Sequence, residues 1–355
     1  FARKNGFELA ERDGACVVVD HRAAAGNGDD CLFTGIAFAE DGLVFGADDR
    51  PVPEELKEAY GEFSLIAFTG RGIELRTDYF GFGKWYYFID DNHFIAATGY
   101  HLLLLLLAAV RAPLEMDIPR SLANLSDIGF GFTFGQIFTR QMDVRNTYVS
   151  LPIERLRFDP ATHSLTREKL PLYGLVTNPE PWDEDAYEEA VRLGTEEIRS
   201  NLQAVLASDR FDRVVIDLSA GFDSRIVFAA MTTLPRRLRD KVSVCIHGSH
   251  LADELPIGHA VNNLYGYDVW NSAETGTSEI FSDDGELDLF NLSLDLGCYT
   301  NLEIIRKCDV DPRTIKIMGG GGDILFGFYR THGAYARRLA TLDDAALVEK
   351  IATDA

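Results

Sequence analysis

The sequence predicts two domains of different fold class: an α+β domain with a mainly antiparallel sheet, then an α/β domain with a parallel sheet. In the first half, short β-branched or aromatic segments are separated by Gly, Asp and Asn, as hairpin loops require. In the second half, continuous apolar strands alternate with helical segments, which is typical of a parallel sheet covered on both faces. A length of 355 residues agrees with about two domains of roughly 150 residues each.

The first domain is predicted to run from residue 1 to about 170. Leu102–Val110 is apolar without alternation and indicates a buried helix, because nine residues are too few to cross a bilayer. The predicted strands are Ala15–Asp20, Gly42–Gly46, Glu62–Phe68, Gly72–Arg76, Lys84–Ile89, His93–Ala96, Thr147–Leu151 and Ile153–Phe158.

Asn178–Pro181 is the predicted linker, because it holds two prolines and precedes a change in composition. Asp183 is placed to cap a helix whose apolar residues, from Tyr187 to Val205, recur at helical spacing. The elements predicted after this helix are strand Arg213–Leu218, helix Ser224–Met231, strand Val242–Ile246, helix Leu255–Leu264, strand Tyr267–Trp270 and strand Thr314–Met318.

Composition limits the partners and the compartment. Lys and Arg number 34 against 56 Asp and Glu, giving a net charge of −22, so a nucleic acid partner is not expected. The five cysteines have no C-x-x-C spacing, which favours a reducing compartment over a disulfide or zinc framework. Because no membrane span or signal segment is recognised either, we expect a cytoplasmic protein without a membrane partner.

The segment Asp217–Ser224, which reads Asp-Leu-Ser-Ala-Gly-Phe-Asp-Ser, is the most informative in the chain. A buried strand ends, small residues turn the chain, and a helix begins near Asp223. Free N–H groups at a helix start can bind an anion, serine hydroxyls add donors, and a carboxylate can hold Mg²⁺ beside a polyphosphate. An ordinary Asp or Ser helix cap is the alternative interpretation of this turn.

Three motifs resemble those of the asparagine synthetase superfamily, which also contains β-lactam synthetases and lasso-peptide cyclases. Residues 219–224 are similar to the S-G-G-x-D-S pyrophosphate loop of ATP pyrophosphatases, with Ala220 in place of the first glycine. Gly319–Tyr329 resembles S-G-E-G-A-D-E-L-F-G-G-Y. Tyr60–Phe68 and Arg76–Tyr87 resemble the L-x-G-x-F-A-F and R-D-x-x-G-x-x-P-L-Y-Y signatures of the glutaminase-like domain.

The resemblance implies a glutaminase-like, Ntn-hydrolase-type domain over residues 1–175 and an ATP-pyrophosphatase domain over 183–355. It implies ATP and Mg²⁺ as cofactors, with Asp223 and Asp323 as catalytic residues and magnesium ligands. Leu218 and the backbone of Ile246 are expected beside the adenine and ribose, and Gly319 under the nucleotide. The implied nucleotide-binding residues are Leu218, Ser219, Ala220, Gly221, Phe222, Ser224, Ile246, Gly319 and Gly320.

The sequence also departs from the family. Phe1 is not the N-terminal Cys that a glutaminase of this family uses, and the glutamine-pocket motif is absent, so we expect the first domain to be inactive. Gly320 stands where the motif has an acidic residue, or tyrosine in β-lactam synthetases. The family continues into a helical segment with a catalytic lysine, so we expect the second domain to be incomplete at its C-terminus.

These features predict a ligase that adenylates a carboxylate, releases pyrophosphate and transfers the acyl group to an amine. The expected partners are a small-molecule or peptide carboxylate and an amine donor, while homo-oligomerisation stays open. Two alternatives stay open: a glutamine-dependent amidotransferase whose Cys lies before Phe1, and a nucleotide-binding pseudoenzyme or assembly subunit. A tRNA-thiolating enzyme fits least, because it needs a basic RNA-binding face. Arg225, directly after the loop, is expected to contact a phosphate.

Overall fold

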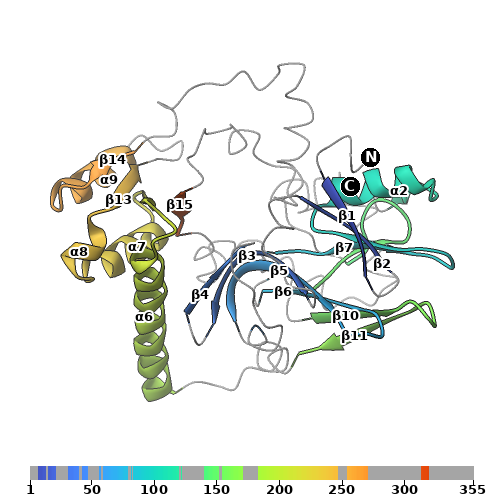
Figure 1. The fold of residues 1–355 in the computed structure, drawn as a ribbon. Coiled ribbons are helices and arrows are strands. Elements are labelled where there is room, and N and C mark those ends of the chain that lie inside the picture. The colour runs from blue at the N-terminus through green and yellow to red at the C-terminus, as the bar shows by residue number, and fades with distance from the viewer. Residues whose placement is uncertain are drawn as a thin grey trace. The chain divides into compact units, whose positions relative to one another are not determined.

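Two units make up the part of the chain that the computed structural model describes (Figure 1). Of the described residues, those up to 170 belong to the first unit and those from 183 onward to the second. The predicted linker at Asn178–Pro181 lies outside the described residues. The structure describes residues 7–12, 15–20, 31–39, 42–46, 56, 59–78, 81, 83–119, 121, 140–151, 154–170, 183–246, 254–270 and 313–319.

Antiparallel strands form the first unit. Its larger sheet has the order β11-β10-β6-β5-β3-β4, with antiparallel neighbours throughout. A smaller sheet has the order β8-β7-β9, and β1 pairs with β2; these pairs are antiparallel too. The strands are β1 (Phe7–Arg12), β2 (Ala15–Asp20), β3 (Cys31–Ala39), β4 (Gly42–Phe45), β5 (Tyr60–Phe68), β6 (Ile73–Thr77), β7 (Tyr86–Ile89), β8 (Phe94–Ala97), β9 (Thr147–Val149), β10 (Glu154–Asp159) and β11 (Ser164–Lys169).

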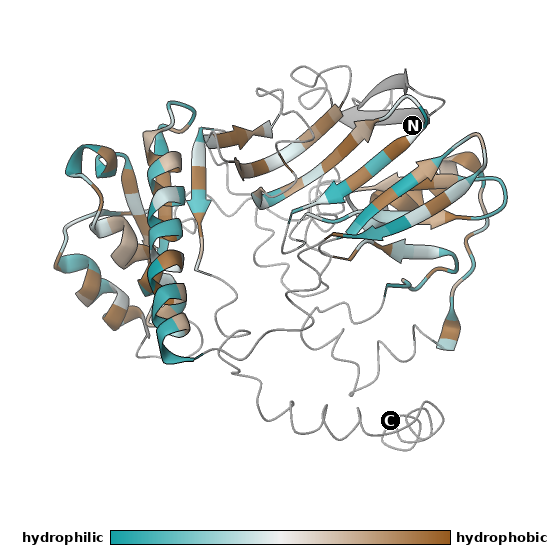
Figure 2. Ribbon diagram, turned by 90° about the horizontal axis from the view of Figure 1, so that it is seen from below, coloured by the Kyte–Doolittle hydropathy of each residue, from teal (hydrophilic) through white to brown (hydrophobic). Residues whose placement is uncertain are grey.

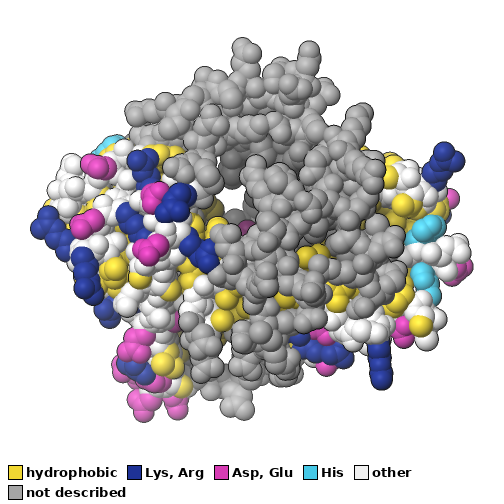
Figure 3. Space-filling model, viewed as in Figure 1, with side chains coloured by type: hydrophobic (Ala, Val, Ile, Leu, Met, Phe, Trp, Pro, Cys, Tyr) yellow, Lys and Arg dark blue, Asp and Glu magenta, His cyan; other side chains and the backbone are white. Residues whose placement is uncertain are grey.

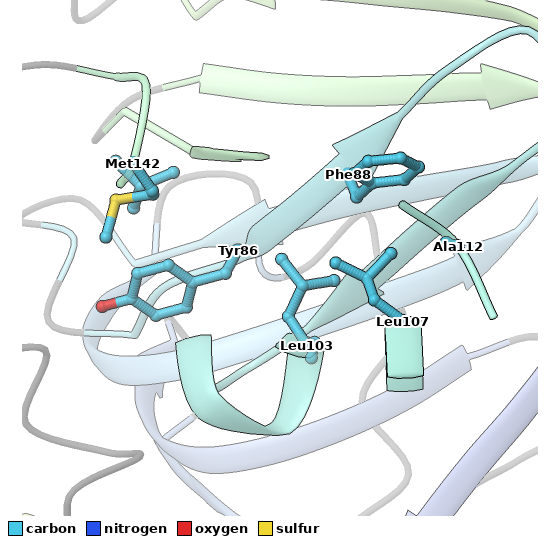
Figure 4. Packing of buried hydrophobic residues seen from close by; sticks show 8 residues of the cluster. Tyr86, Phe88, Leu103, Leu107, Ala112 and Met142 are labelled. Carbon is cyan, nitrogen blue, oxygen red and sulfur yellow. The ribbon is translucent and has the colours of Figure 1, made fainter. Parts of the chain in front are cut away.

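Helix α2 (Tyr100–Val110) covers one face of the smaller sheet (Figure 4). Tyr86 and Phe88 of β7 belong to one buried cluster with Leu103 and Leu107 of α2, all of them nearly or fully inaccessible to solvent. The apolar run that predicts a buried helix is therefore helical and packs on a sheet. No helix among the described residues has the length and apolar character that a membrane crossing needs.

The other face of β7 packs against the larger sheet. Successive side chains of a strand point to opposite faces, so Tyr87 lies on the face opposite Tyr86. Tyr87 forms a second buried cluster with Leu75 of β6 and Leu156 of β10. The two sheets and α2 therefore form three consecutive layers in this unit.

Strands β1, β3 and β11 are not among those predicted from the sequence. In β3, Gly35 interrupts the apolar run and has a φ of +110°. A Cβ at this position would overlap the carbonyl oxygen of Glu62 on β5, so the pairing requires a residue that strand propensity disfavours. Strand β11 is mostly polar and exposed, and no apolar alternation marks it.

A parallel sheet organises the second unit. Its order is β14-β13-β12-β15, and its three strand pairings are all parallel. Helix α7 connects β12 to β13, and α9 lies between β13 and β14, as crossovers between parallel strands require. The elements are α6 (Glu184–Ala207), β12 (Arg213–Leu218), α7 (Phe222–Thr232), α8 (Arg236–Arg239), β13 (Val242–Ile246), α9 (Glu254–Asn263), β14 (Asp268–Val269) and β15 (Thr314–Ile317).

Helix α6 is capped as predicted but packs along only part of its length. The Asp183 side chain accepts the N–H of Ala186 at 2.8 Å. Leu202, Val205 and Leu206 are buried at its C-terminal end. Toward its N-terminal end the apolar residues Tyr187 and Val191 are both more than half exposed. Figure 2 shows the long helix as largely hydrophilic, and acidic side chains gather over its first turns in Figure 3.

Arginines surround a buried carboxylate in the larger sheet of the first unit. Glu74 of β6 is nearly buried, and its oxygens lie 2.5 Å from Nε of Arg76, 2.9 Å from Nε of Arg157 and 3.2 Å from Nε of Arg155. Burial raises the pKa of Glu74, but hydrogen bonds and charge attraction from these arginines outweigh burial and lower it below its usual value. Glu74 is therefore charged in the folded state, where its charge holds β6 against β10.

Glu74→Gln should destabilise the protein by about 3 kcal/mol at pH 7, because it removes the charge from a buried ion-pair network. A lowered folded-state pKa gives stability that is present above the unfolded pKa and lost as the pH falls through the folded pKa. The difference between wild type and variant should therefore shrink below about pH 4. Urea unfolding at a series of pH values measures it.

Glu115→Gln is the matched control, because Glu115 forms an exposed ion pair with Arg145 at 3.2 Å. It should change the free energy of unfolding by less than about 1 kcal/mol. Equal effects of the two substitutions would show that the Glu74 network contributes nothing beyond a surface pair.

Candidate functional site

The candidate site is the turn that joins β12 to α7. Strand β12 ends at the buried Leu218, and α7 begins at Phe222 with Gly221 as its N-cap residue. Ser219 and Ala220 are half-buried between them. The turn lies at the carboxyl end of a parallel strand, the edge at which open α/β sheets bind their ligands.

Two serine hydroxyls close this turn. The N–H of Ser219 donates to Oγ of Ser224 at 3.0 Å, and the N–H of Gly221 donates to Oγ of Ser219 at 3.1 Å. The two hydroxyl oxygens lie 3.0 Å apart, within hydrogen-bond distance. Ser224 is buried, so its hydroxyl is fixed beneath the turn. The serines of the motif therefore shape the turn as well as supplying hydroxyl groups to it.

The start of α7 has the electrostatics of an anion site. The N–H of Arg225 donates to the carbonyl of Gly221 at 3.4 Å, within the first turn. Helix geometry gives the N–H groups before this one no acceptor inside the helix, and the aligned peptide dipoles make this end positive. Asp223 lies half-buried in the first turn, where a carboxylate is stabilised by that dipole. One carboxylate and a positive helix end thus lie side by side.

Arg225 lies over an exposed aromatic ring rather than extending into solvent. Its Nε donates to the carbonyl of Gly221 at 3.3 Å, and its guanidinium carbon lies 4.7 Å from the ring centroid of Phe222. Phe222 is 76% exposed. A cation stacked on a ring is weakly stabilised, and here the stacking holds the guanidinium beside the turn.

Gly319 connects the second motif to this turn. Strand β15 pairs in parallel with β12, so its carboxyl end, followed by Gly319, reaches the same edge of the sheet. A Cβ on Gly319 would lie 2.5 Å from backbone atoms of Asp223 and Ser224. The structure therefore brings together two motifs that are about a hundred residues apart in the sequence. Gly320 and Asp323 lie outside the described residues.

Leu218 and Ile246 lie side by side at the carboxyl ends of β12 and β13, where they are register partners and both buried. Helix α9 crosses them closely: a Cβ on Gly258 would lie 2.7 Å from Cγ2 of Ile246 and 3.4 Å from the carbonyl oxygen of Leu218. Gly258 was not identified from the sequence as a residue of the site. A glycine inside a helical segment, where it is unfavourable, was the sequence signal for it.

The described residues contain no group of three or more His, Cys, Asp or Glu side chains placed to hold a metal ion. Among the described residues of the turn, Asp223 supplies a carboxylate, while Asp323 lies outside the described residues. Mg²⁺ usually binds through one or two carboxylates and substrate phosphates, so Asp223 and two hydroxyls are a chemically suitable set.

No family model matches the chain, and no curated protein sequence matches it. The assignment of a ligand to the turn therefore depends on the chemistry of its side chains and on its contact with Gly319.

Gly319→Ala should displace the end of β15 or the start of α7, because real Cβ atoms do not approach backbone atoms to 2.5 Å. We expect a loss of about 1–3 kcal/mol in the free energy of unfolding. Hydrogen exchange should also accelerate at the amide of Arg225, whose N–H donates to the carbonyl of Gly221 at 3.4 Å. Gly194→Ala in α6 is the control, because its Cβ would meet nothing within 4 Å and alanine favours a helix. Equal stability of the two variants would contradict the close contact.

Proposed function

We propose that the protein is an ATP-dependent ligase that joins a carboxylate to an amine. A carboxylate oxygen of the substrate attacks the α-phosphorus of ATP, the bond to the β-phosphate oxygen breaks, and pyrophosphate leaves. The amine nitrogen then attacks the acyl carbon, AMP leaves, and the amine loses a proton. Activation is needed because a carboxylate is a poor electrophile, whereas AMP is a good leaving group.

The contact between Gly319 and the Asp223–Ser224 peptide carries the proposal. The resemblance to asparagine synthetases requires residues 219–224 and 319–323 to contact the same nucleotide. Parallel pairing of β12 with β15 puts the first residue of the second segment directly on the first segment. An ordinary helix cap gives no reason for this convergence of two motifs.

Each side chain then has a role that suits its chemistry. The hydroxyl of Ser219 and the N–H groups at the start of α7 would bind the pyrophosphate oxygens as negative charge grows on them, and the buried Ser224 hydroxyl would hold the turn in shape. Asp223 and Asp323 would hold Mg²⁺, which neutralises the polyphosphate. Leu218 and the backbone of Ile246, at the carboxyl ends of their strands, would lie beside the adenine and ribose.

We propose a small molecule or peptide as the carboxylate and a separate or intramolecular amine as the acceptor. An amine within the same substrate would react faster because it is held at a high effective concentration. Glutamine is not needed as an ammonia source in this proposal. Cys16 lies within strand β2, where it is no N-terminal nucleophile.

Asp223→Asn should weaken binding of magnesium–ATP by about tenfold or more while leaving the fold intact, because it removes charge from a half-buried site rather than packing from the core. Isothermal titration calorimetry measures the affinity, and thermal unfolding checks the fold. Asp240→Asn is the control, because Asp240 is an exposed carboxylate preceding β13, at the other end of the parallel strands. Undiminished affinity in Asp223→Asn would reject the magnesium assignment.

Exchange of labelled pyrophosphate into ATP should depend on the substrate carboxylate, because pyrophosphate leaves only when a carboxylate attacks. Alanine at Ser219, Asp223 or Asp323 should lower kcat/KM by on the order of a hundredfold, and lower unfolding stability far less. If the protein binds ATP but gives no exchange with any candidate carboxylate, it is a nucleotide-binding pseudoenzyme. Gly320, which has no side chain to accept a proton, favours that alternative.

A further inference from the structure

An ion pair between a buried carboxylate and a partly exposed lysine lies in the sheet directly before the candidate site. Asp217, the residue before the end of β12, is 5% exposed. Nζ of Lys316, on β15, lies 3.0 Å from its Oδ1. The Lys316 side chain is 39% exposed, so its charged end reaches inward from the edge of the described sheet.

The surroundings make a carboxylate costly at this position. Side chains two residues apart on a strand share a face, which places Asp217 beside Val215; the register places it beside Cys245 of β13. Both neighbours are buried and apolar. A buried carboxylate loses its hydration, and a protein with apolar residues of similar size in place of a buried ion pair is often at least as stable. In some proteins such ion pairs are retained because they favour one packing or strand register over the alternatives.

The pair connects the two strands that build the site. Asp217 lies two residues before Ser219, and Lys316 lies three residues before Gly319. Val215 is the register partner of Lys316, so continuing this register sets Gly319 beside Leu218. A shift of β15 by one residue would turn Lys316 to the other face and remove Gly319 from the Asp223–Ser224 peptide.

We infer that Lys316 is a positioning residue: its ion pair with Asp217 holds β15 in the register that places Gly319 against the turn before α7. The effect on nucleotide binding rests on the proposed function, whereas the effect on the turn does not. A generic stabilising ion pair would instead support the whole sheet equally.

Hydrogen exchange followed by mass spectrometry separates these two roles. Lys316→Met should accelerate exchange about tenfold in residues 219–225 and 314–319, while 242–246 in β13 keep the wild-type rate. Lys316→Arg should restore the wild-type pattern, because the guanidinium can reach the same carboxylate. Equal acceleration in all three segments, or no change in any, would overturn the inference.

Arg313→Met is the matched control at the opposite end of β15. Arg313 pairs with Asp212 at 2.6 Å, both side chains being at least half exposed, so its loss should leave exchange in 219–225 unchanged. If Lys316→Met does not fold, the double variant Asp217→Asn with Lys316→Met, which leaves no charge buried, provides the same comparison.

Calorimetry with magnesium–ATP then tests the link to function. If wild type binds, Lys316→Met should bind about tenfold more weakly and Lys316→Arg about as well as wild type. Equal affinity of wild type and Lys316→Met would overturn the effect on the nucleotide. Absence of binding by wild type would reject the proposed function, while the exchange pattern would still decide the role of Lys316.

Discussion

Parallel hydrogen bonding between β12 and β15 sets the positions of the candidate site residues. The register of these strands brings Gly319 onto the Asp223–Ser224 peptide, and pairing of β12 with β13 brings Leu218 next to Ile246. Parallel strands end at the same edge, so residues from three distant parts of the sequence converge there. Neither motif alone has this property, since each is a short strand followed by small residues.

The layers of the first unit are joined by side chains that point alternately to the two faces of β7. Tyr86 and Phe88 bind α2 to the smaller sheet, and Tyr87 binds that sheet to the larger one. On the larger sheet, Glu74 and its arginines show that charge can be buried when several partners share it.

Local patterns in the sequence predicted many elements well. The bounds of β2, β12 and β13 agree with the predicted strands, since a continuous apolar or β-branched run has an unambiguous length. Strand β3 was not predicted, because Gly35 interrupts its apolar run. The glycine is needed where the backbone of β3 lies close to β5, and this long-range contact cannot be seen in the sequence. The N-terminal half of α6 carries an apolar pattern that the described structure leaves exposed.

For the site, the sequence indicated which residues form the turn but not how they contact one another. The hydrogen bonds between Ser219 and Ser224 depend on the helix start, and the contact with Gly319 depends on strand pairing across the chain. Gly258 lies against β12 and β13, and Lys316 forms an ion pair with Asp217 of β12. These contacts join distant parts of the chain, so the spacing of residues in the sequence does not predict them. The types of residue suggest a chemistry, whereas the order and pairing of the strands determine which residues come together at the site.

The hydroxyl network of the turn has a consequence for ligand selectivity. Because Ser219 and Ser224 already hold the turn together, an anion of the kind proposed would meet a preformed site, and little conformational entropy would be lost in ordering it. The same anion must replace existing hydrogen bonds, and such an exchange contributes only about 1 kcal/mol for each bond. In the proposed function, the charge of the ligand would add a contribution of similar size at the helix end. A densely charged polyphosphate would therefore be favoured at this helix end over a neutral ligand of the same shape.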